Sequence, residues 1–169
     1  MAVFAVFSSL GVVDAQTKAL GCIFSTNGFG ISYEHSMETK SFMSVSLSLD
    51  TDDLMWERAD YPGVSASFVW NIIFAEIVSA YGNRISFFAG PGLMTGYVTD
   101  LDRQGGFAFG LEGRIGVECR FRRPFILTAS VSPVLGTHVT SRSGNLFLKL
   151  YKTGLIETIV PEIGIKYAF

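Results

Sequence analysis

GFAFGLEGRIGVECRF, residues 106–121, alternates between hydrophobic and polar or small side chains along its whole length. Successive side chains of a β-strand point to opposite faces, so one face of this segment would be hydrophobic and the other would hold two acids and two bases. A tilted strand that crosses a bilayer needs about 9 to 11 residues of this pattern. The segment therefore predicts one strand of a transmembrane β-barrel. Its hydrophobic face consists of Phe107, Phe109, Leu111, Gly113, Ile115, Val117, Cys119 and Phe121.

The composition fits a single closed sheet better than a membrane helix or a nucleic-acid-binding domain. The chain has 169 residues, of which 49% are hydrophobic and 17% are charged, and its formal net charge is −2. No segment approaches the roughly 20 consecutive apolar residues of a membrane helix, and a nucleic-acid partner would require a basic face. The polar faces carry mostly Ser and Gly, which suit a cramped interior. No nucleic-acid partner is therefore expected.

The first residues are typical of an export signal. Ala2 to Val13 form an apolar core, and Val13-Asp14-Ala15 is a small-residue cleavage site of the A-x-A kind. Residues 1–15 are therefore predicted to be a signal peptide, and residues 16–169 a single outer-membrane β-barrel domain. The usual basic n-region is missing, so an N-terminal strand is the alternative.

The pattern predicts an all-β fold, an eight-stranded antiparallel up-and-down transmembrane β-barrel. Asn27-Gly28 is a strong hairpin signal between the first two strands. Bacterial barrels have an even number of strands, with short turns at one end and longer loops at the other. Residues 140–156 are assigned to a long external connection, within which residues 146–151 fit either a strand or a helical turn. The expected strands span residues 19–26, 29–36, 41–50, 64–74, 85–99, 106–121, 125–139 and 158–169.

The two cysteines are expected to remain unpaired. Cys22 and Cys119 fall in the outward register of strands that are not neighbours in this order. Bridged Cα atoms lie within about 7 Å of each other, so a disulfide between these strands is excluded. Both are predicted to be free thiols that face lipid.

The end of the chain resembles the C-terminal signal by which outer-membrane barrels are recognised for assembly. The chain ends in Phe169, and the hydrophobic residues Ile163, Ile165 and Tyr167 alternate upstream of it. The resemblance implies that these four residues act as an assembly signal, with the barrel-assembly machinery as a partner during biogenesis.

Most of the chain, from Ala19 onward, is similar to the small eight-stranded outer-membrane barrels of the OmpX and OmpA type. Residues 154–169 and the segment FFAGPG at residues 87–92 resemble uncharacterised outer-membrane barrel proteins of Bacteroidetes. These resemblances imply a location in the bacterial outer membrane, with its lipid as a partner. They do not imply one activity, because such barrels include adhesins, anchors and enzymes.

The inward register carries many of the ionisable residues of the expected strands. An eight-stranded barrel has an interior just wide enough for side chains to fill it, and an unpaired buried charge is very costly. The sequence therefore predicts a network of paired charges that plugs the lumen. A small, porin-like pore is the alternative, and it would require a continuous wet path between the pairs. The predicted network comprises Glu34, Glu112, Arg114, Glu118, Arg120, His138, Glu162 and Lys166.

These features favour a structural or surface-interaction role over catalysis. Trp56 and Tyr61, in an acidic external loop, are candidates for binding an extracellular protein or glycan. The chain carries no P-loop, dinucleotide fingerprint, zinc spacing or nucleophile elbow. No catalytic residue, cofactor or metal site is therefore predicted.

Two other functions remain open. Lipid A deacylase barrels use a His, a Ser and an acid near the outer rim, and this chain has His138, Thr140 or Ser141, and Glu157 near the ends of adjacent expected strands. However, His138 falls in the inward register, and the motif of that family has no clear match. The other alternative is a soluble lipocalin-like barrel, in which the hydrophobic faces would line a ligand cavity.

Overall fold

The described part of the chain is almost entirely β-structure. The computed structural model describes residues 18–25, 28–38, 40–51, 62–79, 82–100, 105–121, 124–142, 145–152, 155 and 161–169. Among these residues, no helix has the length and apolar character needed to cross a membrane. The predicted signal peptide, Asn27, Trp56, Tyr61 and Glu157 lie outside the described residues. The strands are β1 (Lys18–Phe24), β2 (Gly28–Glu38), β3 (Ser41–Asp50), β4 (Gly63–Val78), β5 (Arg84–Thr99), β6 (Gly105–Arg120), β7 (Phe125–Val131), β8 (Val134–Arg142), β9 (Asn145–Leu150) and β10 (Glu162–Ala168).

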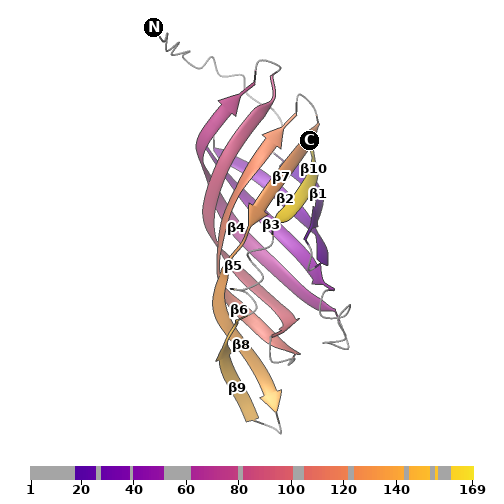
Figure 1. The fold of residues 1–169 in the computed structure, drawn as a ribbon, viewed down its shortest axis with the longest axis vertical. Helices are drawn as coiled ribbons and strands as arrows, with labels where there is room; N and C mark the ends of the chain where they lie inside the picture. Colours follow the sequence, from indigo (N-terminus) through magenta and orange to yellow (C-terminus); the bar gives the residue numbers. More distant parts are fainter. Residues whose placement is uncertain are drawn as a thin grey trace.

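Eight antiparallel strands close into a barrel (Figure 1). Each of these eight is called a stave here, because one of them is made of two separately numbered strands, β7 and β8. From β1 to β6 each strand pairs with the next, β6 pairs with β7, β7 pairs with β10, and β10 returns to β1. The first and last strands of the chain are therefore neighbours in the ring. The predicted eight-stranded antiparallel barrel is confirmed.

One stave consists of β7 and β8, with an interruption at Ser132 and Pro133. Both strands pair with β6 in one unchanged register, since Ile115 pairs with Val131 and Glu112 with Val134. Proline has no N–H to donate, but the Pro133 carbonyl still accepts a hydrogen bond of 2.8 Å from the backbone N–H of Gly113. The predicted seventh strand, residues 125–139, is thus a single stave that runs on to Arg142.

β9 lies outside the closed ring. In the described part of the chain its ladder is to β8, and the two strands form a hairpin that projects beyond the barrel at the lower end of Figure 1. Residues 145–150 therefore form a strand, so of the two alternatives left open for residues 146–151 the structure has the strand, within a connection that lies outside the ring. The even number of staves is kept because β9 takes no part in closing the ring.

Two strands are longer than predicted. β4 continues to Val78 past a register shift between Ile73 and Ala75, and β2 continues to Glu38 past a similar shift. A bulge adds one residue to one strand of a pair, so the alternation of faces reverses beyond it. Glu76 consequently shares a face with its buried partner Ser86, although unbroken alternation along β4 would place it on the outer face.

The staves are strongly staggered around the ring. Paired residues can be followed around the ring from Lys166 on β10 in both directions. The path through β1, β2, β3, β4 and β5 arrives at Gly110 on β6. The path through β7 arrives at Arg120 on β6, ten residues away from Gly110. With strands about 4.8 Å apart and a rise of about 3.3 Å per residue, this stagger corresponds to a tilt of about 40°. The backbone then lies only about 8 Å from the barrel axis, which leaves room for side chains and little else.

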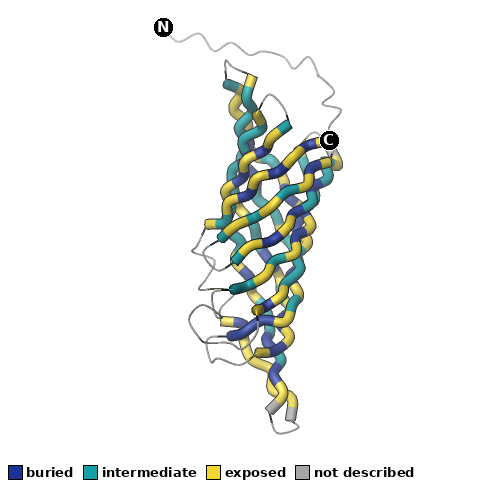
Figure 2. Tube along the Cα trace, turned by 90° about the vertical axis from the view of Figure 1, so that its right-hand side faces the viewer, coloured by how far each residue is buried: buried dark blue, intermediate teal, exposed yellow. Residues whose placement is uncertain are grey.

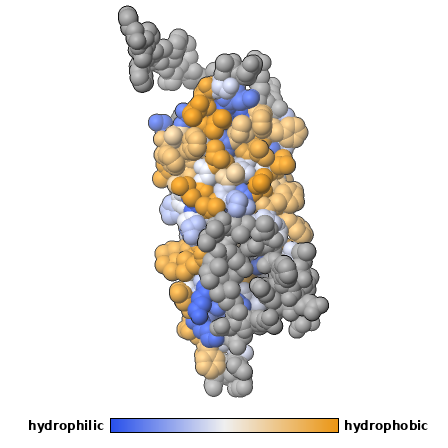
Figure 3. Space-filling model, in the orientation of Figure 1, coloured by the Kyte–Doolittle hydropathy of each residue, from blue (hydrophilic) through white to orange (hydrophobic). Residues whose placement is uncertain are grey.

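The hydrophobic faces of the staves point outward. Phe107, Leu111 and Ile115 are 50%, 64% and 52% exposed, whereas Glu112 between them is 5% exposed. Figure 2 shows the same alternation along the other staves, and Figure 3 shows hydrophobic side chains gathered over the half of the barrel nearest the chain termini. The lipocalin-like alternative required the reverse arrangement and is therefore wrong.

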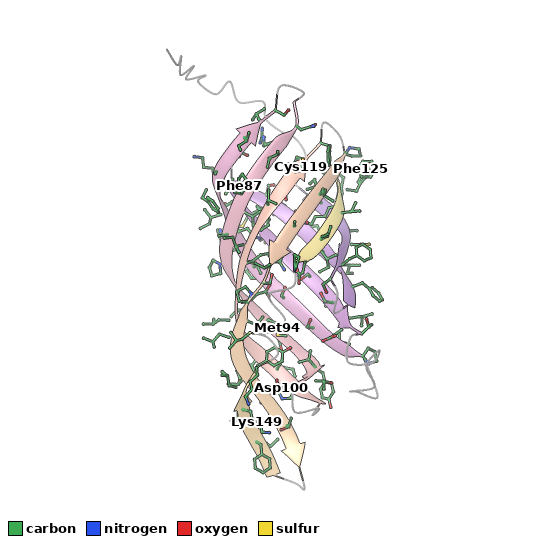
Figure 4. All side chains as sticks on the ribbon, viewed as in Figure 1. Phe87, Met94, Asp100, Cys119, Phe125 and Lys149 are labelled. Atoms are coloured by element: carbon green, nitrogen blue, oxygen red, sulfur yellow. The ribbon has the colours of Figure 1, made fainter. Side chains whose placement is uncertain are left out.

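Cys22 and Cys119 are free thiols, as predicted, and Cys22 is exposed. Cys119 lies near the end of the barrel that carries the C-terminus, close to Phe125 (Figure 4).

Candidate functional site in the barrel interior

The eight ionisable residues predicted to line the interior all occupy inward-facing positions. Five of them are 5% exposed or less, namely Glu34, Glu112, Glu118, His138 and Lys166. The others, Arg114, Arg120 and Glu162, are half-buried. The structure divides these residues into two ion groups and one separate histidine.

The first ion group, here the terminal ion group, consists of Glu34, Lys166, Glu118 and Arg120. Lys166 Nζ donates a hydrogen bond to Glu34 Oε1, and Arg120 Nε donates one of 2.6 Å to Glu118 Oε1. The charges of Glu34 and Lys166 also act on the Glu118 carboxylate, so the two pairs form one electrostatic unit. The second carboxylate oxygens of Glu34 and Glu118 are buried and have no hydrogen-bond partner among the described residues.

The second ion group, here the central ion group, consists of Arg114 and two carboxylates. Arg114 Nη2 lies 3.3 Å from Glu112 Oε1 and 3.8 Å from Glu162 Oε2. The same guanidinium donates hydrogen bonds of 3.0 Å to Ser132 Oγ and 3.1 Å to Ser44 Oγ. Arg114 thereby connects β6 with β3 and β10 across the lumen, and one positive charge is shared by two negative charges.

His138 belongs to neither ion group. Its Nε2 lies 3.1 Å from the carbonyl oxygen of Val98, and its ring stacks on Tyr151 with centroids 6.1 Å apart. Thr140 shares the inner face of β8 with it, whereas Ser141 is exposed on the outer face. The structure therefore does not bring His138 and Ser141 together.

Several interior residues escaped the sequence-based prediction. Phe42 and Phe88 are each 2% exposed, and their rings pack edge to face with centroids 5.2 Å apart. Alternation alone would have found them, because Phe42 shares a face with Ser44, and Phe88 lies between outward residues. Asn71, in contrast, is at an inward position in the alternation of the expected strand 64–74; it is fully buried and donates a hydrogen bond of 3.0 Å to Ser44 Oγ.

Another ion pair joins the ends of β4 and β5. Arg84 Nη1 lies 3.7 Å from Glu76 Oε1, and the two side chains are 43% and 36% exposed. Ser86 also donates a hydrogen bond of 3.2 Å to Glu76. The sequence did not predict this pair, because the bulge that turns Glu76 toward Ser86 leaves no signal in the alternation.

A cavity of about 150 Å³ lies between the central ion group and the far ends of β1, β2 and β3. Glu112, Arg114 and Glu162 form part of its wall, and Asp50 contributes a third carboxylate. Hydroxyl groups line it from Ser46, Ser48, Ser65, Ser67 and Ser132, and hydrophobic side chains line it from Met94, Val98, Val134 and Tyr151. The cavity is therefore polar on one side and hydrophobic on the other.

No group of three or more His, Cys, Asp or Glu residues in the described ranges has a geometry that could hold a metal ion. The four residues of the predicted assembly signal, Ile163, Ile165, Tyr167 and Phe169, lie on the outer face, each 50–55% exposed.

Comparison with known proteins finds similarity at the level of structure. No family model matches the chain, and no curated protein sequence matches it significantly. The N-terminal β-barrel domain of OprF from Pseudomonas aeruginosa is similar in structure, with a TM-score of 0.48 and 14% sequence identity. The similarity covers 91% of this chain and 98% of the OprF chain.

The terminal ion group predicts the effect of removing its lysine. Lys166→Met should lower the free energy of unfolding by about 3–5 kcal/mol, because it leaves the Glu34 carboxylate buried without its cation. Adding Glu34→Gln should recover much of this loss, since the pair is then neutral. Urea unfolding of the protein in lipid vesicles would measure both effects. Arg84→Met, in the half-exposed pair, is the matched control and should cost less than about 1 kcal/mol. Equal losses for Lys166→Met and Arg84→Met would contradict the role assigned to the group.

Proposed function

We propose that this chain is a bacterial outer-membrane β-barrel protein with a structural or surface-interaction role, whose lumen is closed by its own side chains. The observation that carries the proposal is the continuous outer belt of hydrophobic residues on a closed barrel. Each of the eight staves contributes at least two large exposed hydrophobic side chains, such as Leu20 and Phe24 on β1 and Ile163 and Ile165 on β10. A monomeric soluble protein rarely exposes a hydrophobic patch larger than a few hundred Å².

Ring closure supports the same location. A bilayer offers no water to satisfy backbone N–H and C=O groups, so only helices and closed barrels cross it. The pairing of β1 with β10 removes the two free edges that an open sheet would have. Exposed aromatic residues are also placed on the outer face, where amphipathic rings suit the membrane boundary; they include Trp70, Tyr97 and Tyr167.

Closure of the lumen is supported by the interior contacts at two levels. The Phe42–Phe88 pair and the terminal ion group occupy the half nearest the chain termini, and the central ion group crosses the lumen farther from the termini. In a barrel only about 8 Å in radius these side chains take up most of the cross-section. A pore would have to run through this packing.

The other expectations remain predictions. The export signal and the binding of an extracellular protein or glycan through Trp56 and Tyr61 concern residues outside the described ranges. The hydrophobic belt supports contact with outer-membrane lipid, and the outward placement of Ile163 to Phe169 supports recognition by the assembly machinery. A lipid A-modifying activity receives no support from His138, which faces the interior while Ser141 faces outward.

The location predicts the effect of a charge on the outer belt. Ile115→Arg should impair membrane insertion, because an arginine facing lipid near the bilayer midplane costs about 2–4 kcal/mol. Ser141→Arg, on the projecting hairpin, is the matched control and should insert normally. Membrane fractionation and heat-modifiable migration on a gel would measure insertion and folding. Recovery of the unaltered protein in the soluble fraction without detergent would refute the proposed location.

Closure of the lumen predicts the electrical behaviour of the barrel. The purified protein in a planar bilayer should show no steady single-channel current, because aromatic and ionic side chains fill the cross-section. Removing the aromatic pair with Phe42→Ala and Phe88→Ala should raise the leak current. A steady conductance of the unaltered protein would favour the pore.

The assembly signal predicts a difference between cells and purified components. Phe169→Ser should reduce the amount of folded barrel in the outer membrane, because it removes an aromatic residue of the proposed assembly signal. The same variant should refold into detergent micelles as well as the unaltered protein, since its exposed side chain contributes little to packing. Thr95→Ser, an outward substitution on β5, serves as the control. Loss of refolding by Phe169→Ser would show a structural role instead.

A further inference from the structure

A trough runs across the outer face of the barrel, over the neighbouring strands β3, β4, β5, β6 and β8. Its volume is about 720 Å³, which is within the range of about 300–1,000 Å³ found for small-molecule sites. None of the described residues that line it carries a charge. Its large hydrophobic side chains belong to the outer belt and are each at least 39% exposed, namely Val45, Phe68, Leu93, Phe109, Leu111 and Leu135.

The floor of the trough consists mostly of short side chains. Ala66 on β4 pairs with Thr95 on β5, and the same row of paired residues continues across β6 to Thr137 on β8. Gly110 and Gly136 pair beside this row, and their backbone forms the rest of the floor. The trough therefore arises because short residues on adjacent strands interrupt a surface of large hydrophobic side chains.

The trough lies near the membrane boundary on the side of the projecting hairpin. Leu111 lies nine positions before Arg120, the residue at the end of β6 nearest the chain termini. With a rise of about 3.3 Å per residue and a tilt of about 40°, this separation is about 23 Å along the axis, and the hydrophobic band of such barrels is about 25 Å tall. Met94, labelled in Figure 4, lines the trough at this level, and the exposed Tyr97 follows it on β5. At this level the acyl chains of a lipid meet its headgroup.

A cationic side chain lies beside the β8 end of the trough. The backbone N–H of Tyr151 donates a hydrogen bond of 2.9 Å to the carbonyl oxygen of Gly136, which lines the trough. Lys152 follows Tyr151 in the chain and is exposed, so its ammonium group is within reach of this end. Lysine side chains near a membrane surface attract anionic lipid headgroups. An ammonium group beside a hydrophobic trough thus complements a phosphate group above an acyl chain.

We infer that the trough holds an acyl chain of a lipid with a phosphate headgroup, and that Lys152 binds the phosphate. The occupant is lipid because the trough is part of the hydrophobic belt, which faces the bilayer. The inference rests on the proposed function and deepens it, because it assigns one preferred lipid position within the general contact between belt and membrane.

The inference predicts saturable binding of one phospholipid molecule to each folded chain. The full chain, delipidated in detergent and shown to be folded by heat-modifiable migration, is titrated with dioleoyl phosphatidylglycerol or with dioleoylglycerol, which has the same acyl chains and no phosphate. Native mass spectrometry counts the bound lipid. The phospholipid should bind about fivefold more tightly than dioleoylglycerol, which is the effect of one lysine near a membrane surface. Lys152→Gln should remove this difference.

Two variants test the acyl-chain part of the site. Ala66→Phe should weaken the binding of both lipids at least about tenfold, because its ring fills the floor and displaces the acyl chain. Thr95→Phe, at an exposed position of the floor, should do the same and covers the case in which Ala66→Phe does not fold. Ala129→Phe is the matched control, since it makes the same substitution at an exposed position of β7 outside the trough, and it should bind lipid like the unaltered protein.

Each other outcome decides against the inference or against the proposed function. A folded barrel that retains no phospholipid, shows the same affinity for both lipids, keeps its preference after Lys152→Gln, or loses as much binding with Ala129→Phe as with the trough variants would overturn the inference alone. A stable dimer that the trough variants dissociate would assign the trough to a second copy of the chain and would also overturn the inference. A chain that does not fold as a membrane barrel would instead overturn the proposed function.

Discussion

The pairing of β1 with β10 is the interaction on which the rest of the structure depends. Six residue pairs, from Ala19 with Ala168 to Phe24 with Ile163, convert a sheet with two edges into a ring. Once the ring is closed, each stave has one face toward the lumen and one face toward the outside. The alternating polar and hydrophobic side chains of the sequence lie on these two faces. The stagger of the strands then fixes the radius, and the radius decides how many side chains the interior can hold. A register slip of one residue anywhere in the ring would exchange the two faces of that stave.

The interior is built in successive levels along the axis. The Phe42–Phe88 pair and the terminal ion group lie in the part nearest the chain ends, the central ion group crosses the middle, and the cavity lies beyond it. Ionic groups suit such an interior only when each charge is matched, because a small radius leaves little water for solvation. Arg114 on β6 contacts three other strands of the ring, through Ser44 on β3, Ser132 between β7 and β8, and Glu162 on β10.

Much of this arrangement could be predicted because period-two alternation is a local property of the sequence. It gave the eight staves, the outward face of β6 and the inward positions of residues such as Glu34 and Lys166. It could not give the bulge near Ala75, which depends on the pairing with β5 and turns Glu76 to the other face. Nor could it identify the partners of inward residues, because these depend on the stagger of the whole ring. His138 shows this, since its inward position was predictable but its contacts with Val98 and Tyr151 were not. The strand β9 was ambiguous for a different reason, because alternating leucines over six residues also fit one helical turn.

The contact between Glu34 and Lys166 also bears on the order of events during folding. The two residues are separated by 132 positions in the chain, and β10 is the last stave to be synthesised. Their side chains can meet only once β10 has joined β1 and β2, so a chain whose β10 is not yet in place carries both charges without their native partners. Contacts between residues so far apart in sequence form slowly, because the intervening chain must first be ordered. The ion pair thus stabilises the product of the final folding step, and a barrel that lacks its last strand does not gain this stabilisation.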